Sequence, residues 1–148
     1  MLRPSPTDIE VKFEGGNMIT ETDLTGKIVY ANRLFLKMTG YSKEELIGTP
    51  HSIIRHPDMP KKCFEMMWKA VNTGNYWEGY VKNLRKDGAY YWVIVVVTPK
   101  FDDDGKICGY IAVRKPPGDF TLEEMKELYM NMMDAEKYER TNGIMTLI

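Results

Sequence analysis

A short stretch at residues 53–62, with the sequence IIRHPDMPKK, carries the side chains best suited to hold a ligand. It places Arg55, His56 and Asp58 beside two prolines. A guanidinium can make two parallel hydrogen bonds to a phosphate, and an imidazole or a carboxylate can bond the edge of a ribose or an adenine. The three side chains could therefore fix an anionic or nucleotide-bearing group. Their charge pattern alone favours a simpler interpretation, a solvated loop in which Asp58 caps the next helix.

A second candidate is an amide on the apolar face of an expected strand. In the stretch YWEGYVKNLR, residues 76–85, the alternation of a strand places Trp77, Val81 and Asn83 on one face and Lys82 on the other. A buried amide needs hydrogen-bond partners. The pattern fits a ligand that donates and accepts in one plane, and it fits equally a neighbouring backbone group or a buried water.

Asn32 and the tryptophans admit both a binding role and a structural role. Asn32 precedes a short helical stretch, so its first expected role is to cap that helix, and a second role toward a ligand stays open. Trp68 falls on the apolar stripe of a helix and is expected in the core. Trp77 shares the face of Asn83 and is the better candidate for stacking on a ligand. Trp92 is expected to pack in the sheet.

The elements that must position these side chains follow one another closely. Two β-rich runs within residues 17–31, separated by the turn Leu24-Thr25-Gly26, predict a hairpin. Ser42 and Glu45 have the spacing of a capping box and predict a short helix. A longer helix is expected after Asp58, because apolar residues recur at the spacing of one helix face, namely Phe64, Met67, Trp68 and Val71.

Three further strands are expected near residues 76–85, 89–99 and 106–114, joined by the turns KDG and DDDG. The order β-β-α-α-α-β-β-β predicts an α+β domain whose antiparallel sheet carries its helices on one face. Such a layered arrangement leaves room for a pocket between the sheet and the helices.

The C-terminal part predicts one more helix after a linker at residues 114–119. Thr121 and Glu124 have the spacing of a capping box. An apolar stripe follows, made of Leu122, Met125, Tyr129 and Met132. This amphipathic helix needs a covering surface, and we expect it to fold back on the outer face of the sheet. The alternative is a helical dimer or a docked receptor helix.

Composition narrows the class of protein. The 148 residues, 43% of them apolar, suffice for one packed domain. A net charge of −1 with interspersed acids and bases argues against a nucleic-acid partner. The longest apolar run, YYWVIVVV, is too short to span a membrane, and residues 1–10 lack the apolar core of a signal peptide, so we expect a cytoplasmic protein. Cys63 and Cys108, without CxxC spacing, are expected to be reduced thiols.

Together these motifs resemble a PAS domain. DLTGKIVYANRLFLKMTGYSKEELIGTPHSIIRHPDMP is similar to its first half, and WKAVNTGNYWEGYVKNLRKDGAYYWV with GKICGYIAVR is similar to its second half. More narrowly, RHPDMPK, the helix ending in MMW, the Trp-rich strand pair and the late GY resemble the flavin-binding PAS domain of bacterial aerotaxis receptors, which are energy-taxis proteins. The chain then divides into an N-terminal flank at 1–16, a PAS sensor domain at 17–115, and a linker with an amphipathic helix at 116–148.

The resemblance implies a five-stranded antiparallel PAS sheet and a non-covalently bound FAD that senses redox state or oxygen. In such a site the amide of Asn83 would bond the flavin ring, and the RHPD stretch would grip the rest of the cofactor. The resemblance also implies a homodimer formed through the flanks and a chemoreceptor-type transducer or signalling domain as partner, which would bring the chain to the inner membrane. The implied cofactor-binding residues are Asn32, Arg55, His56, Asp58, Trp68, Trp77 and Asn83.

Three related chemistries compete with this interpretation. A photochemical LOV domain resembles PAS but uses a reactive cysteine, and His51 stands where that cysteine would be expected. A haem PAS domain needs an axial ligand, and the two histidines, His51 and His56, do not lie on the long helix that carries it in oxygen-sensing kinases, so haem is the second choice. A zinc site would need a further ligand cluster beside these histidines and Asp58, so no metal site is predicted.

No enzyme motif is present in the sequence. It has no Gly-rich phosphate loop, no GxSxG elbow and no kinase signature, so no catalytic residue is assigned and no enzyme is expected. A flavin reductase would need a further site for NAD(P)H, and a PAS pocket filled by FAD leaves little room for one. A cofactor-free PAS domain that serves only in dimerisation is the remaining alternative.

Overall fold

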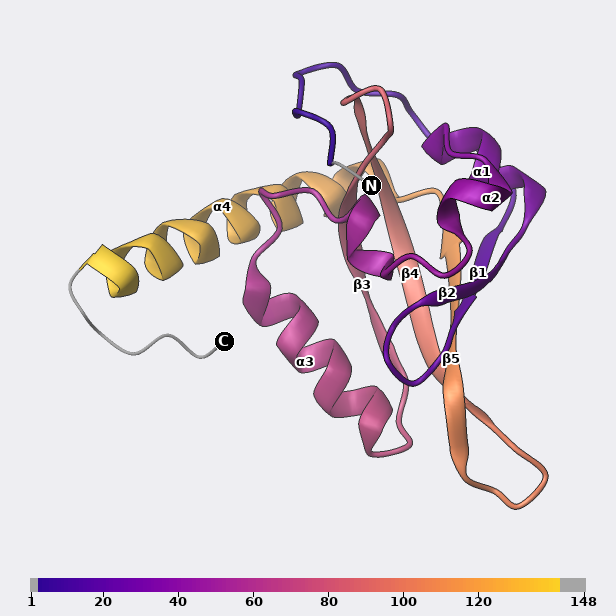
Figure 1. Ribbon diagram of the computed structural model, residues 1–148. Coiled ribbons are helices and arrows are strands. Elements are labelled where there is room, and N and C mark those ends of the chain that lie inside the picture. Colours follow the sequence, from indigo (N-terminus) through magenta and orange to yellow (C-terminus); the bar gives the residue numbers. More distant parts are fainter. Residues whose placement is uncertain (1–2, 142–148) are drawn as a thin grey trace.

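The sheet and its helices are seen in a computed structural model that describes residues 3–141, without the side chains at 119–120 and 138–141 (Figure 1). The strands form one five-stranded antiparallel sheet, as expected, and their order in the sheet is β2-β1-β5-β4-β3. Residues 142–148 of the expected C-terminal segment lie outside the described residues. The elements in chain order are β1 (Met18–Thr22), β2 (Ile28–Ala31), α1 (Arg33–Thr39), α2 (Lys43–Leu46), the 3-10 helix η1 (His51–Ile54), α3 (Lys61–Asn72), β3 (Trp77–Leu84), β4 (Tyr90–Phe101), β5 (Ile107–Lys115) and α4 (Asp119–Thr141).

The first two helices begin where the sequence predicts. Asn32 caps α1, since its Oδ1 accepts a hydrogen bond from Phe35 N at 3.1 Å. Gly40, with a φ of 80°, follows this helix in the left-handed region. Ser42 and Glu45 form the predicted capping box of α2. These local signals fix the short helices that lead into η1 and the stretch at residues 53–62.

The start of α3 differs from the prediction. Its N-cap position is Pro60, which offers no side-chain hydrogen bond. The carboxylate of Asp58 instead forms an ion pair with a lysine of β3, so the prediction that Asp58 caps this helix is wrong. The backbone amides of Lys61 and Lys62 donate to the carboxylate of Glu136 in α4, at 3.3 and 3.4 Å. A side chain distant in sequence therefore provides the cap that the local sequence lacks.

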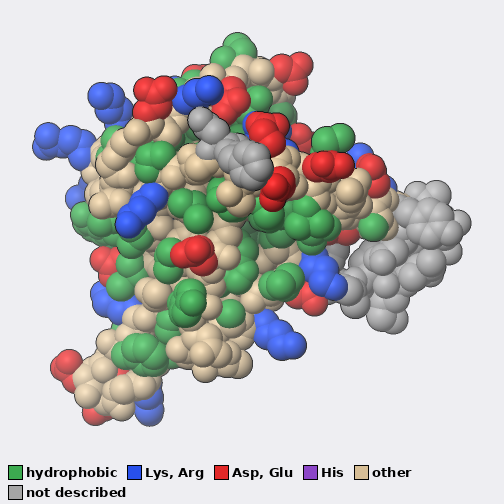
Figure 2. Space-filling view, turned by 180° about the vertical axis from the view of Figure 1, so that it is seen from behind, with side chains coloured by type: hydrophobic (Ala, Val, Ile, Leu, Met, Phe, Trp, Pro, Cys, Tyr) green, Lys and Arg blue, Asp and Glu red, His purple; other side chains and the backbone are tan. Residues whose placement is uncertain are grey.

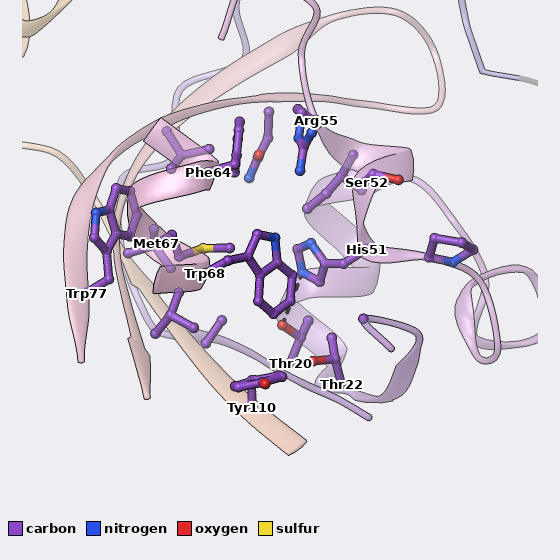
Figure 3. A pocket seen from close by; sticks show the side chains of 18 of the residues that line it. Thr20, Thr22, His51, Ser52, Arg55, Phe64, Met67, Trp68, Trp77 and Tyr110 are labelled. Atoms are coloured by element: carbon purple, nitrogen blue, oxygen red, sulfur yellow. Dashed lines mark hydrogen bonds between the residues drawn. The ribbon is translucent and has the colours of Figure 1, made fainter. Parts of the chain in front are cut away.

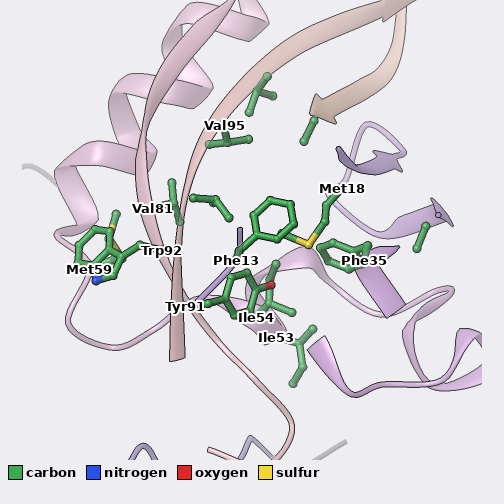
Figure 4. Close-up of a cluster of buried hydrophobic side chains, with 14 of the residues drawn as sticks. Phe13, Met18, Phe35, Ile53, Ile54, Met59, Val81, Tyr91, Trp92 and Val95 are labelled. Carbon is green, nitrogen blue, oxygen red and sulfur yellow. The ribbon is translucent and has the colours of Figure 1, made fainter. Parts of the chain in front are cut away.

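The core lies between the sheet and the helices α1, η1 and α3 (Figure 4). Alternate residues of β4 are buried on the inner face of the sheet, which is the face toward these helices. These residues are Tyr91, Val93, Val95 and Val97. They pack with side chains from the rest of the domain, among them Phe13, Met18, Ile28, Phe35, Leu46 and Ile54. This packing holds the inner face of the sheet in place. The polar side chains of the candidate site project from the same face.

The N-terminal flank runs beside the beginning of β4. Thr7 N donates to Gly88 O at 2.9 Å, and Val11 N donates to Tyr90 O at 2.8 Å. Phe13 of the same segment is buried in the core. The described part of the flank is therefore packed onto the domain.

The C-terminal helix α4 packs on the opposite, outer face of the sheet. It begins at Asp119, so Thr121 lies inside the helix and the predicted capping box at Thr121 is wrong. Tyr129 is buried, its ring stacks on Trp92 with centroids 6.2 Å apart, and its hydroxyl donates to Tyr80 O at 2.8 Å. Hydrophobic side chains gather over this face of the molecule (Figure 2). The expectation that the amphipathic stripe folds back on the sheet is confirmed at Tyr129. Within residues 3–141, no helix has both the length and the apolar character that crossing a membrane requires.

Candidate functional site

A cavity of about 380 Å³ lies between the inner face of the sheet and the segment from η1 to α3 (Figure 3). Phe64, Met67 and Trp68 line it from one face of α3, because residues three and four apart on a helix lie side by side. Strands β1, β3, β4 and β5 contribute the other walls. The polar and aromatic side chains among these include Thr20, Trp77, Asn83, Tyr110 and Arg114.

The aromatic walls depend on two close contacts. Trp68 meets Tyr110 edge to face, with ring centroids 5.2 Å apart. Trp77 folds back along its own strand over Gly79, where an added Cβ atom would lie 2.5 Å from the indole. Gly79 is therefore required for the indole to lie this close to β3. Trp68, which was expected in the core, is only half-buried and lines the cavity as Trp77 does.

The least expected polar group of the cavity is the guanidinium of Arg114, whose residue is 3% exposed. It donates to Thr20 Oγ1 at 3.0 Å and lies 2.6 Å from His51 Nε2. Among the described residues, no carboxylate forms an ion pair with it. Burial lowers the pKa of Arg114 to about 10. A buried cation without a counter-charge is costly, so this position suits a ligand with strong acceptors or negative charge.

His51 is neutral in this arrangement. A guanidinium only donates hydrogen bonds, so His51 Nε2 accepts from Arg114. Burial, and next the charges of Arg114 and Arg55, hold the pKa of His51 well below its ordinary value. The sequence did not lead us to Arg114 or to this role of His51. The signal was present, because Tyr110, Ala112 and Arg114 alternate on one face of β5 and place a charge at the end of a buried row.

Asn83 and Arg55 meet at the edge of the sheet. Their backbones form an isolated antiparallel bridge. Asn83 is 3% exposed, as expected for an amide on the apolar face, and its Nδ2 lies 3.5 Å from Tyr91 Oη. The guanidinium carbon of Arg55 lies 3.7 Å from the ring centroid of Phe64, and its buried Nε has no hydrogen-bond partner within the described part of the chain. Arg55 therefore retains hydrogen-bonding capacity toward a ligand in the cavity.

The other predicted site residues do not line this cavity. His56 is buried, and its Nδ1 accepts from Asp58 N at 3.0 Å. The carboxylate of Asp58 is exposed and lies 3.1 Å from Lys82 Nζ. Asn32 caps α1, and its Nδ2 donates to Asn17 O at 2.9 Å. The cofactor-binding roles of Asn32, His56 and Asp58 stay predictions. In the described part of the chain, no three metal-ligating side chains converge.

Comparison with known proteins gives a consistent result. A family model described as PAS fold matches residues 28–114. The aerotaxis receptor of Escherichia coli strain K12 is 41% identical over 112 residues, which are 76% of this chain and 22% of the receptor. The nitrogen fixation regulatory protein of Klebsiella oxytoca is 30% identical over 118 residues, which are 79% of this chain and 24% of that protein.

A solved structure shares the architecture. The PAS domain of a protein from Colwellia psychrerythraea is 27% identical, with a TM-score of 0.63 over 68% of this chain and 86% of that domain. The match therefore covers most of a separately solved domain. The two curated relatives are much longer, and this chain spans less than a quarter of the length of either.

Proposed function

Because the chain belongs to the PAS family, we propose that its cavity holds the ring system of a non-covalently bound FAD and that the domain is a redox sensor for a signalling partner. The observation that carries the proposal is an aromatic cavity containing a buried guanidinium, that of Arg114, which has no carboxylate partner among the described residues. The flavin ring system is planar and rich in hydrogen-bond acceptors, so it suits both the walls and the donor.

The residues present fit this cofactor. A cavity of about 380 Å³ lies near the lower end of the range for ligand pockets, so the ring system would lie inside and the nucleotide part outside. Asn83 offers an amide that can both donate and accept. Arg55, with its unpaired Nε, is suited to meet the phosphates. His56 and Asp58 follow Arg55 in the chain, and we propose them as contacts of the nucleotide part.

Two rival cofactor chemistries fit less well. A LOV-type adduct needs a thiol beside the ring, and the described lining of the cavity includes neither the buried Cys63 nor the exposed Cys108. Haem needs an available axial ligand, but His51 Nε2 lies 2.6 Å from a guanidinium nitrogen, and His56 does not line the cavity. A cofactor-free dimerisation module would leave the charge of Arg114 buried beside an empty cavity.

The chain's own part in sensing is to hold the cofactor and to respond to its state. A bound flavin would supply reversible electron storage, with a change in hydrogen-bonding character at its N5 edge. Asn83 is suited to follow such a change, because its amide can exchange a donated hydrogen bond for an accepted one. A change of its preferred orientation biases the neighbouring elements by no more than the free-energy difference between the two states.

The 41% identity to an aerotaxis receptor supports a signalling role. We propose that the domain is not an enzyme, that it works in the cytoplasm, and that a chemoreceptor-type transducer or another signalling domain receives its output. A homodimer through the flanks is part of this proposal. Steady-state oxidation of NAD(P)H by the purified chain would instead assign it to the flavin reductases.

A visible spectrum of the purified full-length chain tests the proposal. We expect flavin absorption bands, and FAD as the compound released on denaturation and identified by chromatography. Dithionite should bleach the bands and air should restore them. A Soret band would show that the cofactor is haem and not FAD. A colourless protein that takes up no added FAD would refute the proposal.

A further inference from the structure

The amino end of α3 has an unusual cap. Its first turn has no acidic residue, and Pro60 at the N-cap position offers no side-chain hydrogen bond. The helix instead begins with Lys61 and Lys62, and positive charge at this end opposes the helix dipole. The carboxylate of Glu136, whose residue is 8% exposed, accepts from Lys61 N at 3.3 Å and from Lys62 N at 3.4 Å. Glu136 supplies the acceptors and the negative charge that α3 lacks.

Glu136 is a second anchor of α4, besides its apolar stripe. About two turns earlier, Tyr129 stacks on Trp92 and donates to Tyr80 O, so the first anchor is on the outer face of the sheet. The second anchor reaches past the edge strand β3 to α3, and the amino end of α3 lies close to α4 in the ribbon (Figure 1). The flanking helix therefore contacts elements on both sides of the sheet.

The helix that Glu136 caps is also a wall of the cavity. Phe64, Met67 and Trp68 of α3 line it. At the other end of α3, Asn72 Oδ1 accepts from Tyr110 Oη at 2.5 Å, and Trp68 packs against the same tyrosine. The helix is held by α4 at its beginning and by β5 at its end. Its position between these contacts sets the width of the cavity.

We propose that Glu136 is a positioning residue that couples occupancy of the cavity to the docking of α4. For the identity of the ligand this inference rests on the proposed function. A ligand enclosed between the sheet and α3 favours one position of α3, and the Glu136 cap favours the same position. Because such coupling is reciprocal, the cap strengthens ligand binding by the same factor by which the ligand strengthens the docking of α4.

Substitutions of Glu136 in the full-length chain test the first half of this linkage. Glu136→Gln keeps an acceptor but removes the charge, and Glu136→Ala removes both. We expect Glu136→Ala to weaken FAD binding by about twofold to thirtyfold, the range that corresponds to loss of a helix cap, and Glu136→Gln to weaken it less. Glu127→Gln and Glu127→Ala, at an exposed acid of the same helix, are the matched controls and should bind FAD like the wild type. Unchanged FAD affinity in both Glu136 variants would overturn the proposal.

Hydrogen exchange of α4, with and without FAD, tests the second half. Loading should slow exchange in the part of α4 around Glu136 in the wild type, and this dependence on FAD should disappear in Glu136→Ala. A purely structural role would speed exchange equally in the loaded and the empty protein. If Glu136→Ala does not fold, Glu136→Gln and the wild type are compared instead, each with and without FAD. Hydrogen exchange in α4 of the wild type that does not change on FAD loading would overturn the coupling. A wild type that binds no FAD overturns the proposed function as well, whereas normal binding without the linkage overturns the coupling alone.

Discussion

Polar side chains are paired differently on the two faces of the sheet. Among the described residues, Arg114 in the cavity wall has no carboxylate partner and Arg55 Nε has no hydrogen-bond partner, and the buried amide of Asn83 belongs to the same lining. On the outer face, Lys82 pairs with Asp58 at 3.1 Å. Polar groups at purely structural positions are expected to pair with one another. A buried polar group without a hydrogen-bond or ion-pair partner costs free energy until a ligand supplies that partner. The difference separates polar groups that need a ligand from polar groups that the fold already pairs.

Replacing Arg114 should break this contrast most strongly. Arg114→Met removes the buried charge, and loss of a buried, hydrogen-bonded charge from an interface costs on the order of 2–5 kcal/mol of binding free energy. We expect most of the purified variant to be colourless. Its ligand-free stability should change little, since removal of an uncompensated charge offsets the lost hydrogen bonds. FAD titration and thermal unfolding measure the two effects. Lys115→Met, at the exposed neighbouring residue, is the control, and full FAD retention in Arg114→Met would contradict the contrast.

Arg55 tests the same contrast within a single loop. Arg55→Ala removes the proposed phosphate contact and should weaken FAD binding by about 1.5–3 kcal/mol, or roughly tenfold to a hundredfold. Asp58→Asn changes an exposed ion pair but keeps a hydrogen-bonding side chain at this proposed nucleotide contact, so it should cost less than about 1 kcal/mol in either binding or stability. Both variants are titrated with FAD near the wild-type dissociation constant. A larger loss in Asp58→Asn than in Arg55→Ala would reverse the comparison.

A methyl group at Gly79 sharpens the role of the aromatic wall. The Cβ atom of Gly79→Ala would lie 2.5 Å from the Trp77 indole, so the ring must leave its place on β3. Overpacking of this kind costs about 1–3 kcal/mol, and we expect lower FAD affinity together with a lower melting temperature. Gly118→Ala, where an added Cβ atom meets nothing within 4 Å, should change neither. Equal behaviour of the two variants would show that the position of the indole does not shape the site.

A pH dependence of stability is expected from His56, which is buried but does not line the cavity. Burial, and next the charge of Lys82, lower the pKa of His56 from 6.5 to about 4. The unfolded chain therefore binds more protons than the folded one between these values, and the stability from neutral His56 is lost as the pH falls from 6.5 toward 4. His56→Gln should flatten this part of the stability curve, measured by urea unfolding across that range. Buried His51 acts in the same direction, so the slope should decrease without vanishing. An unchanged slope of stability against pH in His56→Gln would show that other groups cause the titration.

Local sequence signals predicted the parts of the fold that depend on local physics. The Asn32 cap and the capping box of Ser42 and Glu45 follow from hydrogen bonds between residues three apart. Period-two alternation placed Asn83 on the buried face, because a strand alternates its side chains by geometry alone.

Tertiary contacts account for what the sequence did not predict. Asp58 had the right chemistry to cap α3, but the helix starts after Pro60 and receives its carboxylate from Glu136. Arg114 stood at the start of an apparent linker, and only the pairing of β5 with β1 brings it beside Thr20 and places it in the cavity. Partners distant in the chain decided both positions. The alternation along β5 marks Arg114 as inward-facing, but no local pattern identifies its partners.

The distribution of the three tryptophans gives the chain a built-in optical readout. Trp68 and Trp77 line the cavity, while Trp92 stacks against Tyr129 of α4 on the other face. A flavin absorbs in the range of indole emission, so loading the cavity should quench the first two most strongly, whereas lifting α4 should shift the emission of Trp92 to longer wavelength. Variants that keep a single tryptophan would therefore report ligand entry and helix docking as separate fluorescence signals, without any attached label.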